Sequence, residues 1–217
     1  LLLRTDGGSF GAGKPARELT PTTPTLDRVL GGSLLLAAKH VYAVAEVSGG
    51  GRALLRAPLD GSAKAAPVSL PGSPAHLEPG LTVSADGGRL ALLARAGSVA
   101  DTNEDLLVVD DATGKAVNVS AAKANFIAPG AGLLGTPCPH GLARVALSPQ
   151  GKQLAYVQLT GAKGHELWVR PTDLSQAATH VTGAGRFAAA VDRVRGAFWL
   201  DSDRLVFWAG PSPNSLD

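Results

Sequence analysis

The chain has 217 residues, of which 45% are hydrophobic and 18% are charged, and its formal net charge is +2. This length and composition fit a folded domain with a large core. The mild charge, without a dense cluster of lysine and arginine, argues against a nucleic-acid-binding protein, and no apolar stretch approaches the roughly 18 residues that span a bilayer.

Short apolar runs alternate with turn-forming residues along the chain, which predicts β-strands joined by tight turns. Each unit has an apolar run, a polar turn and a second apolar run, followed by a third run and a short closing one. One unit has the turn Ser148-Pro149-Gln150-Gly151, and an earlier one has Asp86-Gly87-Gly88. Both supply the φ angles that a tight hairpin needs. Such units, roughly 40–50 residues long, predict an all-β protein, a β-propeller of four-stranded antiparallel blades.

The units follow one another in chain order, and their second strands are expected to begin at Val41, Leu90, Leu154 and Leu205. A stretch rich in glycine and proline interrupts the spacing and is expected to be a loop inserted between blades. The predicted division is the outer half of a blade at 1–32, blades at 33–72 and 73–120, the inserted loop at 121–144, a blade at 145–185 and the inner half of a blade at 186–217.

The predicted chain begins and ends within a blade, which leaves two arrangements open. The N-terminal outer strands could complete the last blade and close a four-bladed ring, or the chain could be part of a larger ring. We favour the larger ring, because rings of about six to eight blades are the more common. The sequence contains no methionine, so we expect a processed or truncated segment, and its single cysteine, Cys138, rules out an internal disulfide.

One blade resembles the repeat of the TolB-type, or PD40, β-propellers. The residues that carry the resemblance are Ser-Pro-Gln-Gly-Lys-Gln-Leu-Ala-Tyr at 148–156, Glu-Leu-Trp-Val at 166–169 and His-Val-Thr at 180–182. In that family a Ser-Pro-Asp-Gly-Lys hairpin precedes a Leu-Trp-Val strand and a Leu-Thr strand. Gln150 replaces the usual acidic residue, and the blade at Val41 lacks the Asp-Gly turn.

The resemblance implies a fold and a general kind of function, but no catalytic residue. Members of the family are mostly bacterial, often periplasmic or surface-attached, and usually bind other proteins. Some instead shield the active site of a peptidase domain that follows the propeller.

Three glycine-rich motifs are better explained as turns and connectors than as catalytic or nucleotide sites. The Gly-x-Ser-x-Gly at 7–11 is followed by residues that cannot start the helix of a nucleophile elbow. The near phosphate-binding loop at 8–14 has Pro15 where a hydroxyl must reach magnesium. The Gly-x-Gly motif at 183–188 lacks the long strand that a dinucleotide fingerprint follows.

Two polar clusters remain as candidate sites. Oxygen ligands alternate at Asp101, Asn103 and Asp105, as in a calcium loop, although the glycine after Asp105 is missing and a solvated acidic loop is the alternative. The inserted loop offers a candidate surface for binding a partner, with Phe126, Cys138, His140 and Arg144. Cys138 and His140 could also form a nucleophile pair or hold a metal, but two ligands are too few for a zinc site.

We therefore expect a non-enzymatic, extracytoplasmic propeller, periplasmic or secreted, that binds or scaffolds proteins and needs no cofactor unless calcium binds. Its partners would be proteins, or the remainder of its own polypeptide. Two alternatives stay open. One is a propeller that gates a hydrolase or peptidase domain outside this segment, and the other is a metal-dependent propeller that binds a small molecule.

Overall fold

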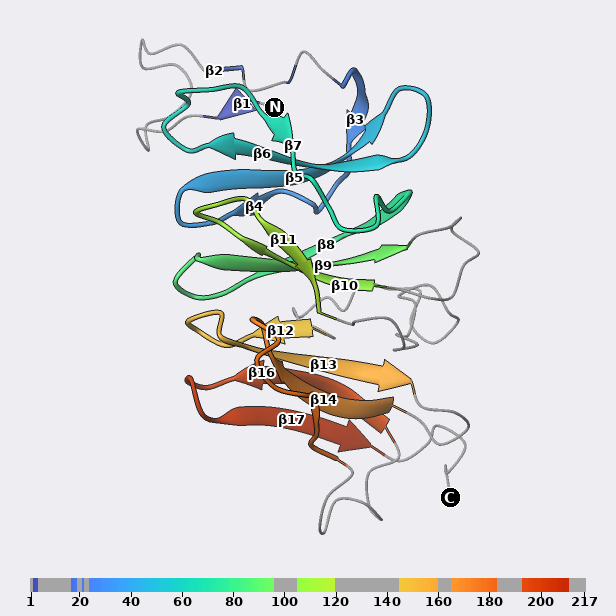
Figure 1. The fold of residues 1–217 in the computed structure, drawn as a ribbon, viewed down its shortest axis with the longest axis vertical. Helices are drawn as coiled ribbons and strands as arrows, with labels where there is room; N and C mark the ends of the chain where they lie inside the picture. Colours follow the sequence, from blue (N-terminus) through green and yellow to red (C-terminus); the bar gives the residue numbers. More distant parts are fainter. Residues whose placement is uncertain are drawn as a thin grey trace.

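The chain forms antiparallel sheets stacked face to face. The computed structural model describes residues 2–3, 17–18, 21, 24–95, 105–119, 145–159, 165–182 and 193–210, and within these ranges it contains strands and turns but no helix. Figure 1 shows the layers, from a sheet near the N-terminus to a hairpin near the C-terminus. The predicted fold class, an all-β protein built of antiparallel propeller-like blades, is confirmed.

Three sheets and one hairpin make up the stack. The first sheet holds β3 (Leu26–Val29), β4 (Leu35–Leu36), β5 (His40–Val47), β6 (Arg52–Pro58) and β7 (Ala66–Pro67). The second sheet holds β8 (His76–Val83), β9 (Arg89–Arg95), β10 (Asp105–Asp110) and β11 (Ala116–Asn118). The third sheet holds β12 (Val145–Leu147), β13 (Gln153–Leu159), β14 (His165–Pro171) and β15 (Thr179–His180).

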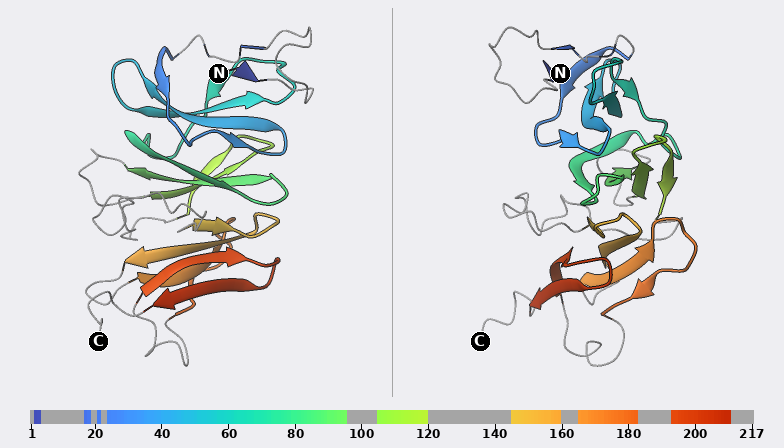
Figure 2. Two further views of the ribbon diagram at one scale, coloured as in Figure 1. Left: turned by 180° about the vertical axis from the view of Figure 1, so that it is seen from behind. Right: turned by 90° about the vertical axis from the view of Figure 1, so that its left-hand side faces the viewer.

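The terminal hairpin consists of β16 (Arg193–Trp199) and β17 (Leu205–Gly210), and one parallel pair of residues links β14 to β16. A separate two-stranded sheet, β1 (Leu2–Leu3) with β2 (Arg17–Glu18), lies near the first sheet (Figure 1). The first sheet and the terminal hairpin lie at opposite ends of the stack in every view (Figures 1 and 2). The described sheets therefore form an open stack and do not close into a ring.

The first strand of the first sheet is split. β4 pairs with the start of β5, and β3 pairs with its end, across a register shift between Leu26 and Arg28. This sheet thus includes residues 26–29, which lie within the range 1–32 that we assigned to the outer half of a blade.

The predicted turns form through hydrogen bonds that the sequence motif supplies. Ser84 Oγ donates to Asp86 Oδ1 (2.6 Å) and accepts from the Arg89 amide (3.0 Å), which closes the β8–β9 hairpin. The Ser84 hydroxyl is the main cause that holds the pKa of Asp86 below its usual value. Ser148 repeats the contact by accepting from the Gln153 amide (3.0 Å). The Ser-x-x-Gly pattern therefore specifies the same turn in two blades.

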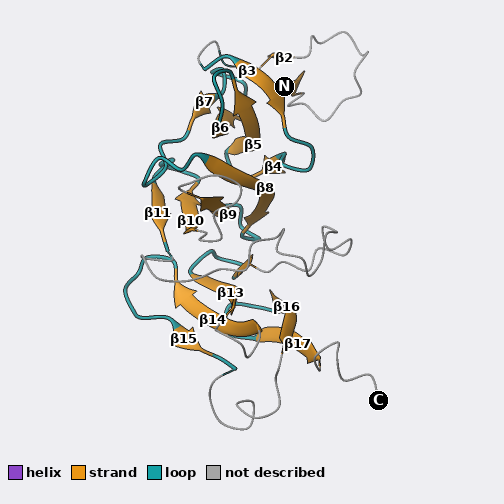
Figure 3. Cartoon of the chain, turned by 90° about the vertical axis from the view of Figure 1, so that its right-hand side faces the viewer, coloured by secondary structure: helices purple, strands orange, loops and turns teal. Residues whose placement is uncertain are grey.

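Apolar side chains fill the spaces between sheets. Tyr42 and Leu54 of the first sheet are fully buried against Leu90 and Leu107 of the second. A second cluster joins the second and third sheets, and a third joins the third sheet to the terminal hairpin. Each fully buried leucine contributes about 1.5–3 kcal/mol, so packing between sheets stabilises the stack. Figure 3 shows these layers edge-on. None of the described segments forms a helix that could cross a membrane.

Candidate functional site

The two ends of the strands carry different polar groups. At one end, which we call the hairpin end, lie the turns at 84–88, 148–152 and 200–204. At the opposite end, the loop end, β5 and β9 finish and β6 and β8 start. The inserted segment 121–144 also joins its flanking strands at the loop end, because β11 finishes there and β12 starts there. The loop end is therefore the first candidate for a binding surface.

Six charged or titratable side chains form a continuous cluster at the loop end of the first two sheets. We call it the charged cluster, and its members are Arg28, Glu46, Arg52, His76, Glu78 and Arg95. Arg95 is the most buried, with 5% of its side chain exposed, and its Nη2 lies 2.9 Å from Glu78 Oε1. Arg28 is the most exposed, at 68%. The cluster thus extends from the interior to the solvent.

His76 lies at the centre of the charged cluster. Arg52 Nη1 donates to His76 Nε2 (2.9 Å) and to the Leu77 carbonyl (2.8 Å), so β6 of the first sheet is tied to β8 of the second. The same ring nitrogen also lies 3.4 Å from Glu78 Oε1, so His76 contacts both an arginine and a carboxylate of the cluster. Burial, helped by the charges of Arg52 and Arg95 and opposed by Glu78, lowers the pKa of His76 below its usual 6.5.

Stability should depend on pH through His76. Its pKa is lowered in the folded chain, so between pH 6.5 and that lower value the unfolded chain binds a proton that the folded chain does not. The free energy of unfolding should therefore be highest above this window and fall as pH decreases through it. Urea denaturation of wild-type and His76→Gln chains at several pH values from about 8 to about 5 checks this. We expect a shallower decline in the variant, and equal slopes would contradict the prediction.

The outer part of the charged cluster is a bidentate ion pair. Arg28 Nε and Nη2 donate to the two carboxylate oxygens of Glu46, at 2.7 and 3.0 Å. This hydrogen bonding is the first cause of the raised pKa of Arg28 and of the lowered pKa of Glu46. Both groups face solvent, so the pair adds little to stability and remains available for exchange with charges of a partner.

The hairpin end carries a buried polar contact between sheets. Asp111, which follows β10 and is 1% exposed, accepts hydrogen bonds from groups of the first sheet. Its carboxylate receives the Lys39 amide (2.8 Å) and the Tyr42 hydroxyl (3.0 Å), and it lies 2.9 Å from His40 Nδ1. Burial and the Asp111 charge raise the pKa of Tyr42, so its hydroxyl stays a donor.

The His40–Asp111 pair connects the first sheet to the second. In a catalytic triad the carboxylate orients the imidazole while the second ring nitrogen faces a nucleophile. Here Arg56 Nη2 also lies against His40 Nδ1 (3.2 Å) and donates to the carbonyl of Asp111. All of these groups connect the first sheet to the turn after β10. The arrangement joins two blades.

The same contact recurs one sheet further along the stack. Thr172 follows β14 as Asp111 follows β10. The Asp111 amide donates to the Gly88 carbonyl, and the Thr172 amide donates to the Lys152 carbonyl, in each case the residue just before the second strand of the same sheet. The Thr172 hydroxyl interacts with the guanidinium of Arg89, which occupies the position of His40. The first residue after a third strand therefore ties each sheet to the preceding one.

The hairpin tips are also linked from sheet to sheet. The Ala38 amide donates to the Gly87 carbonyl (3.0 Å), and the Asp86 amide donates to the Pro149 carbonyl (3.0 Å). Ser202 Oγ then donates to Gln150 Oε1 (2.6 Å), the side chain that replaces the acidic residue of the repeat. These bonds fix the spacing of the sheets at the hairpin end.

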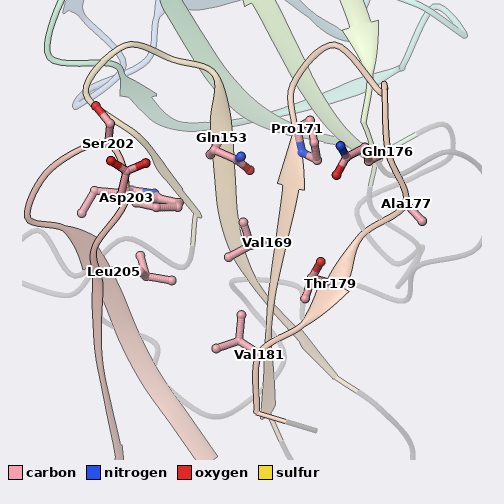
Figure 4. A pocket seen from close by; sticks show the side chains of 11 residues that line it. Gln153, Val169, Pro171, Gln176, Ala177, Thr179, Val181, Ser202, Asp203 and Leu205 are labelled. Carbon is pink, nitrogen blue, oxygen red and sulfur yellow. The ribbon is translucent and has the colours of Figure 1, made fainter. Parts of the chain in front are cut away.

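A groove of about 350 Å³ lies between the third sheet and the terminal hairpin, at the hairpin end (Figure 4). Val169 and Val181 line it on the side of the third sheet, and Leu205 lines it on the side of β17. Its polar lining includes Gln153 and Asp203. No cluster of described His, Cys, Asp or Glu side chains in this groove, or elsewhere in the described ranges, could hold a metal ion.

Most of the candidate residues from the sequence lie outside the described residues. These are Asp101, Asn103, Phe126, Cys138, His140 and Arg144. Asp105 is described, and it begins β10, where it pairs with Ala94. The calcium hypothesis and the partner-binding loop therefore stay predictions.

Calorimetry with calcium on the wild-type and Asp105→Asn chains checks the calcium hypothesis. A calcium site predicts heat that is weaker in the variant, because a carboxylate binds calcium more strongly than an amide. Equal or absent heat in the two chains would contradict it.

The charged cluster was missed in the sequence. Its members are spread from residue 28 to residue 95, and no spacing between them matches a known motif. One partial signal exists: the register of the β8–β9 turn, continued along both strands, would place Arg95 opposite Glu78, its ion-pair partner, although a register shift between Leu77 and Leu81 sets it opposite His76. The contacts with Arg52 and Glu46 depend on how two sheets pack.

Comparisons with known proteins found similar solved structures at low sequence identity. No known family profile and no curated protein matches the chain. TolB from Acinetobacter baumannii is a similar solved structure, with 16% identity and a TM-score of 0.43 over 74% of this chain and 33% of that one. Putative TolB from Agrobacterium tumefaciens has 16% identity and a TM-score of 0.43 over 76% of this chain and 48% of that one.

A structure from an analysis of two prolyl endopeptidases is also similar, with 12% identity and a TM-score of 0.41. The similarity covers 71% of this chain and 22% of that one. The chain thus spans between a third and a half of the two TolB structures. The assignment of the fold rests on the stacked sheets described above.

Proposed function

We propose that the chain is a non-enzymatic propeller segment that binds another protein outside the cytoplasm, and that the loop end forms the contact. The observation that carries this proposal is the charged cluster, which places a partly exposed array of both signs on a rigid scaffold. Charges arranged in this way set the orientation and the partner in protein association more than they set raw affinity.

The scaffold supports a binding role because it is held rigidly at the other end. The contacts of Asp111 and Thr172 and the bonds between hairpin tips lock adjacent sheets together. Loops on a rigid framework are where binding residues are usually found. β11 ends and β12 starts at the loop end, and this supports including Phe126 and Arg144, which lie between these strands in the sequence, in the proposed surface.

A location outside the cytoplasm, periplasmic or extracellular, is part of the same proposal. The single cysteine and the lack of methionine leave few side chains that an oxidising compartment would modify.

The experiment compares the loss of two exposed arginines, each of which forms an ion pair with a nearby carboxylate. Arg28 lies in the charged cluster, and Arg204, which is 73% exposed and paired with Asp201, lies at the hairpin end. Immobilised wild-type, Arg28→Ala and Arg204→Ala chains would each be incubated with extracytoplasmic proteins of the source, and the bound proteins would be quantified by mass spectrometry.

A partner of the loop end should bind wild-type and Arg204→Ala chains equally and be reduced about fivefold or more on Arg28→Ala, as for the loss of one interface ion pair worth about 1 kcal/mol. Both substitutions should leave the free energy of unfolding nearly unchanged, because surface ion pairs contribute little. Equal capture by all three chains would contradict binding at this end.

A further inference from the structure

One ring nitrogen of His76 lies between a hydrogen-bond donor and an acceptor. Arg52 Nη1 is 2.9 Å from Nε2, and Glu78 Oε1 is 3.4 Å from the same atom. A neutral ring with its lone pair on Nε2 can accept from Arg52. The charged ring carries a proton on both nitrogens, so its Nε2 can donate to Glu78 and cannot accept from Arg52. Protonation of His76 therefore exchanges the arginine for the carboxylate.

The charged groups that face His76 come from two neighbouring sheets (Figure 1). Arg52 belongs to β6 of the first sheet, and Glu78 and Arg95 belong to β8 and β9 of the second. Arg95 Nη2 lies 2.9 Å from Glu78 Oε1 and holds this carboxylate next to the ring. Burial is the first cause that lowers the pKa of His76, and the charge of Arg52 is the second. A charged ring and the Arg52 guanidinium thus repel each other, while Glu78 stays in place to receive the proton's hydrogen bond.

Arg52 has a second carboxylate within reach. Its Nη2 lies 3.8 Å from Glu46 Oε1, too far for a hydrogen bond but close enough for an ion pair. An Arg52 side chain repelled by a charged His76 can keep its bond to the Leu77 carbonyl and close this gap. Glu46 Oε1 already accepts from Arg28 Nη2 (3.0 Å). A closer Arg52 therefore competes with Arg28 for the same oxygen.

Arg28 carries this change to the surface. Its side chain is 68% exposed, and its guanidinium is bound to both oxygens of Glu46. When one of these bonds is lost, the positive charge and its N–H donors become available to another group, and a guanidinium pairs best with a carboxylate. The buried histidine and the exposed arginine are thus linked through two intermediate groups, Arg52 and Glu46.

We propose that the charged cluster binds an acidic segment of the partner protein, and that this binding is coupled to protonation of His76, so that affinity rises as pH falls. The inference rests on the proposed function, because it assigns the partner contact to the loop end. At higher pH Arg52 binds His76 and Glu46 holds Arg28. At lower pH His76 binds Glu78, Arg52 binds Glu46, and Arg28 binds the partner. By linkage, an acidic partner favours the charged form of His76 by the same factor.

Nuclear magnetic resonance of the chain alone tests the exchange of partners. The His76 ring and the Arg28 Nε–H signals would be followed from about pH 8 to about pH 5 in wild-type, His76→Gln and His180→Gln chains. His180 is the matched control, because its Nε2 lies 3.2 Å from Glu166 Oε2 in the third sheet. We expect the Arg28 signal to move with the midpoint of the His76 ring in wild type and in His180→Gln, and to stay constant in His76→Gln.

A short polyaspartate peptide tests the chemistry of the partner, because aspartate stays charged down to about pH 5. Its dissociation constant would be measured at about pH 7.5 and about pH 5, with polylysine of the same length as the control peptide. We expect about fivefold tighter binding at the lower pH for wild type and His180→Gln, and a change below about twofold for His76→Gln. Glu46→Gln removes the carboxylate that the two arginines share, so it should bind tightly at both pH values.

Three results would overturn the proposal. They are an Arg28 signal that moves equally in His76→Gln, polyaspartate binding with the same pH dependence in all chains, and tighter binding of polylysine than of polyaspartate. Circular dichroism at each pH checks that every chain compared is folded. If both measurements gave the expected results but capture of natural proteins did not depend on Arg28, only the proposed function would fail.

Discussion

An Asp111→Ala chain is expected to lose about 3–5 kcal/mol of its free energy of unfolding, because the substitution breaks a buried polar contact between two sheets. The carboxylate is 1% exposed and receives the Lys39 amide and the Tyr42 hydroxyl, both from the first sheet. Alanine would leave these donors buried without an acceptor, and each unsatisfied donor costs about 1–3 kcal/mol. Urea denaturation followed by circular dichroism measures the loss.

Asp173→Ala is the matched control for Asp111→Ala. Asp173 lies in the turn after β14, is exposed, and accepts from the Ser175 amide within its own turn. Its loss should cost much less than that of Asp111, because the freed amide can bond to water. If the two variants lost the same amount, the contact between sheets would not contribute to stability as argued. The control also separates the loss of a turn bond from the loss of a bond between blades.

A Gly87→Ala chain should be destabilised by about 3 kcal/mol or more, because the added methyl group would overlap the neighbouring hairpin tip. Gly87 has a φ of +70°, and a Cβ there would lie 2.5 Å from the Ala38 nitrogen. The Ala38 amide donates to the Gly87 carbonyl, so the tips cannot separate without breaking that bond. Thermal or urea unfolding gives the loss.

Gly72→Ala isolates the backbone part of this effect. Gly72 has a similar φ of +74°, but a Cβ added there would have no neighbouring atom within 4 Å. It should lose only the roughly 1–2 kcal/mol that a left-handed conformation costs an alanine. The difference between the two variants then measures the contact between tips. If Gly72→Ala lost as much free energy of unfolding as Gly87→Ala, the backbone conformation alone would explain both losses.

Local pattern was enough to predict the strands and their hairpins. The alternation at 145–157 and the turn Ser148-Pro149-Gln150-Gly151 gave the β12–β13 hairpin, and the Asp-Gly turn at Asp86 gave β8–β9. Both depend on residues fewer than ten positions apart. The split of the first strand into β3 and β4 was missed, since it depends on where β5 can pair on its other edge.

The sites were less predictable than the strands. Of the candidate residues, only Asp105 lies in a described element. The sequence did not indicate a site at the turn after β10, although the Asp111 carboxylate there contacts the Lys39 amide, His40 and the Tyr42 hydroxyl. An aspartate after a strand is most often a solvated turn residue. Only its neighbours in the first sheet make it a buried acceptor.

The sequence by itself determined that this protein consists of repeated antiparallel blades, because hydrophobic alternation and turn residues act over a few positions of chain. The tertiary structure alone decided which charged groups meet. Arg52 reaches His76 across two sheets, and Asp111 reaches His40 across 71 residues, because blade stacking sets these distances. It also decided which faces stay open: Leu36 and Phe198 are apolar like any core residue, and only their place at the two ends of the stack leaves them exposed.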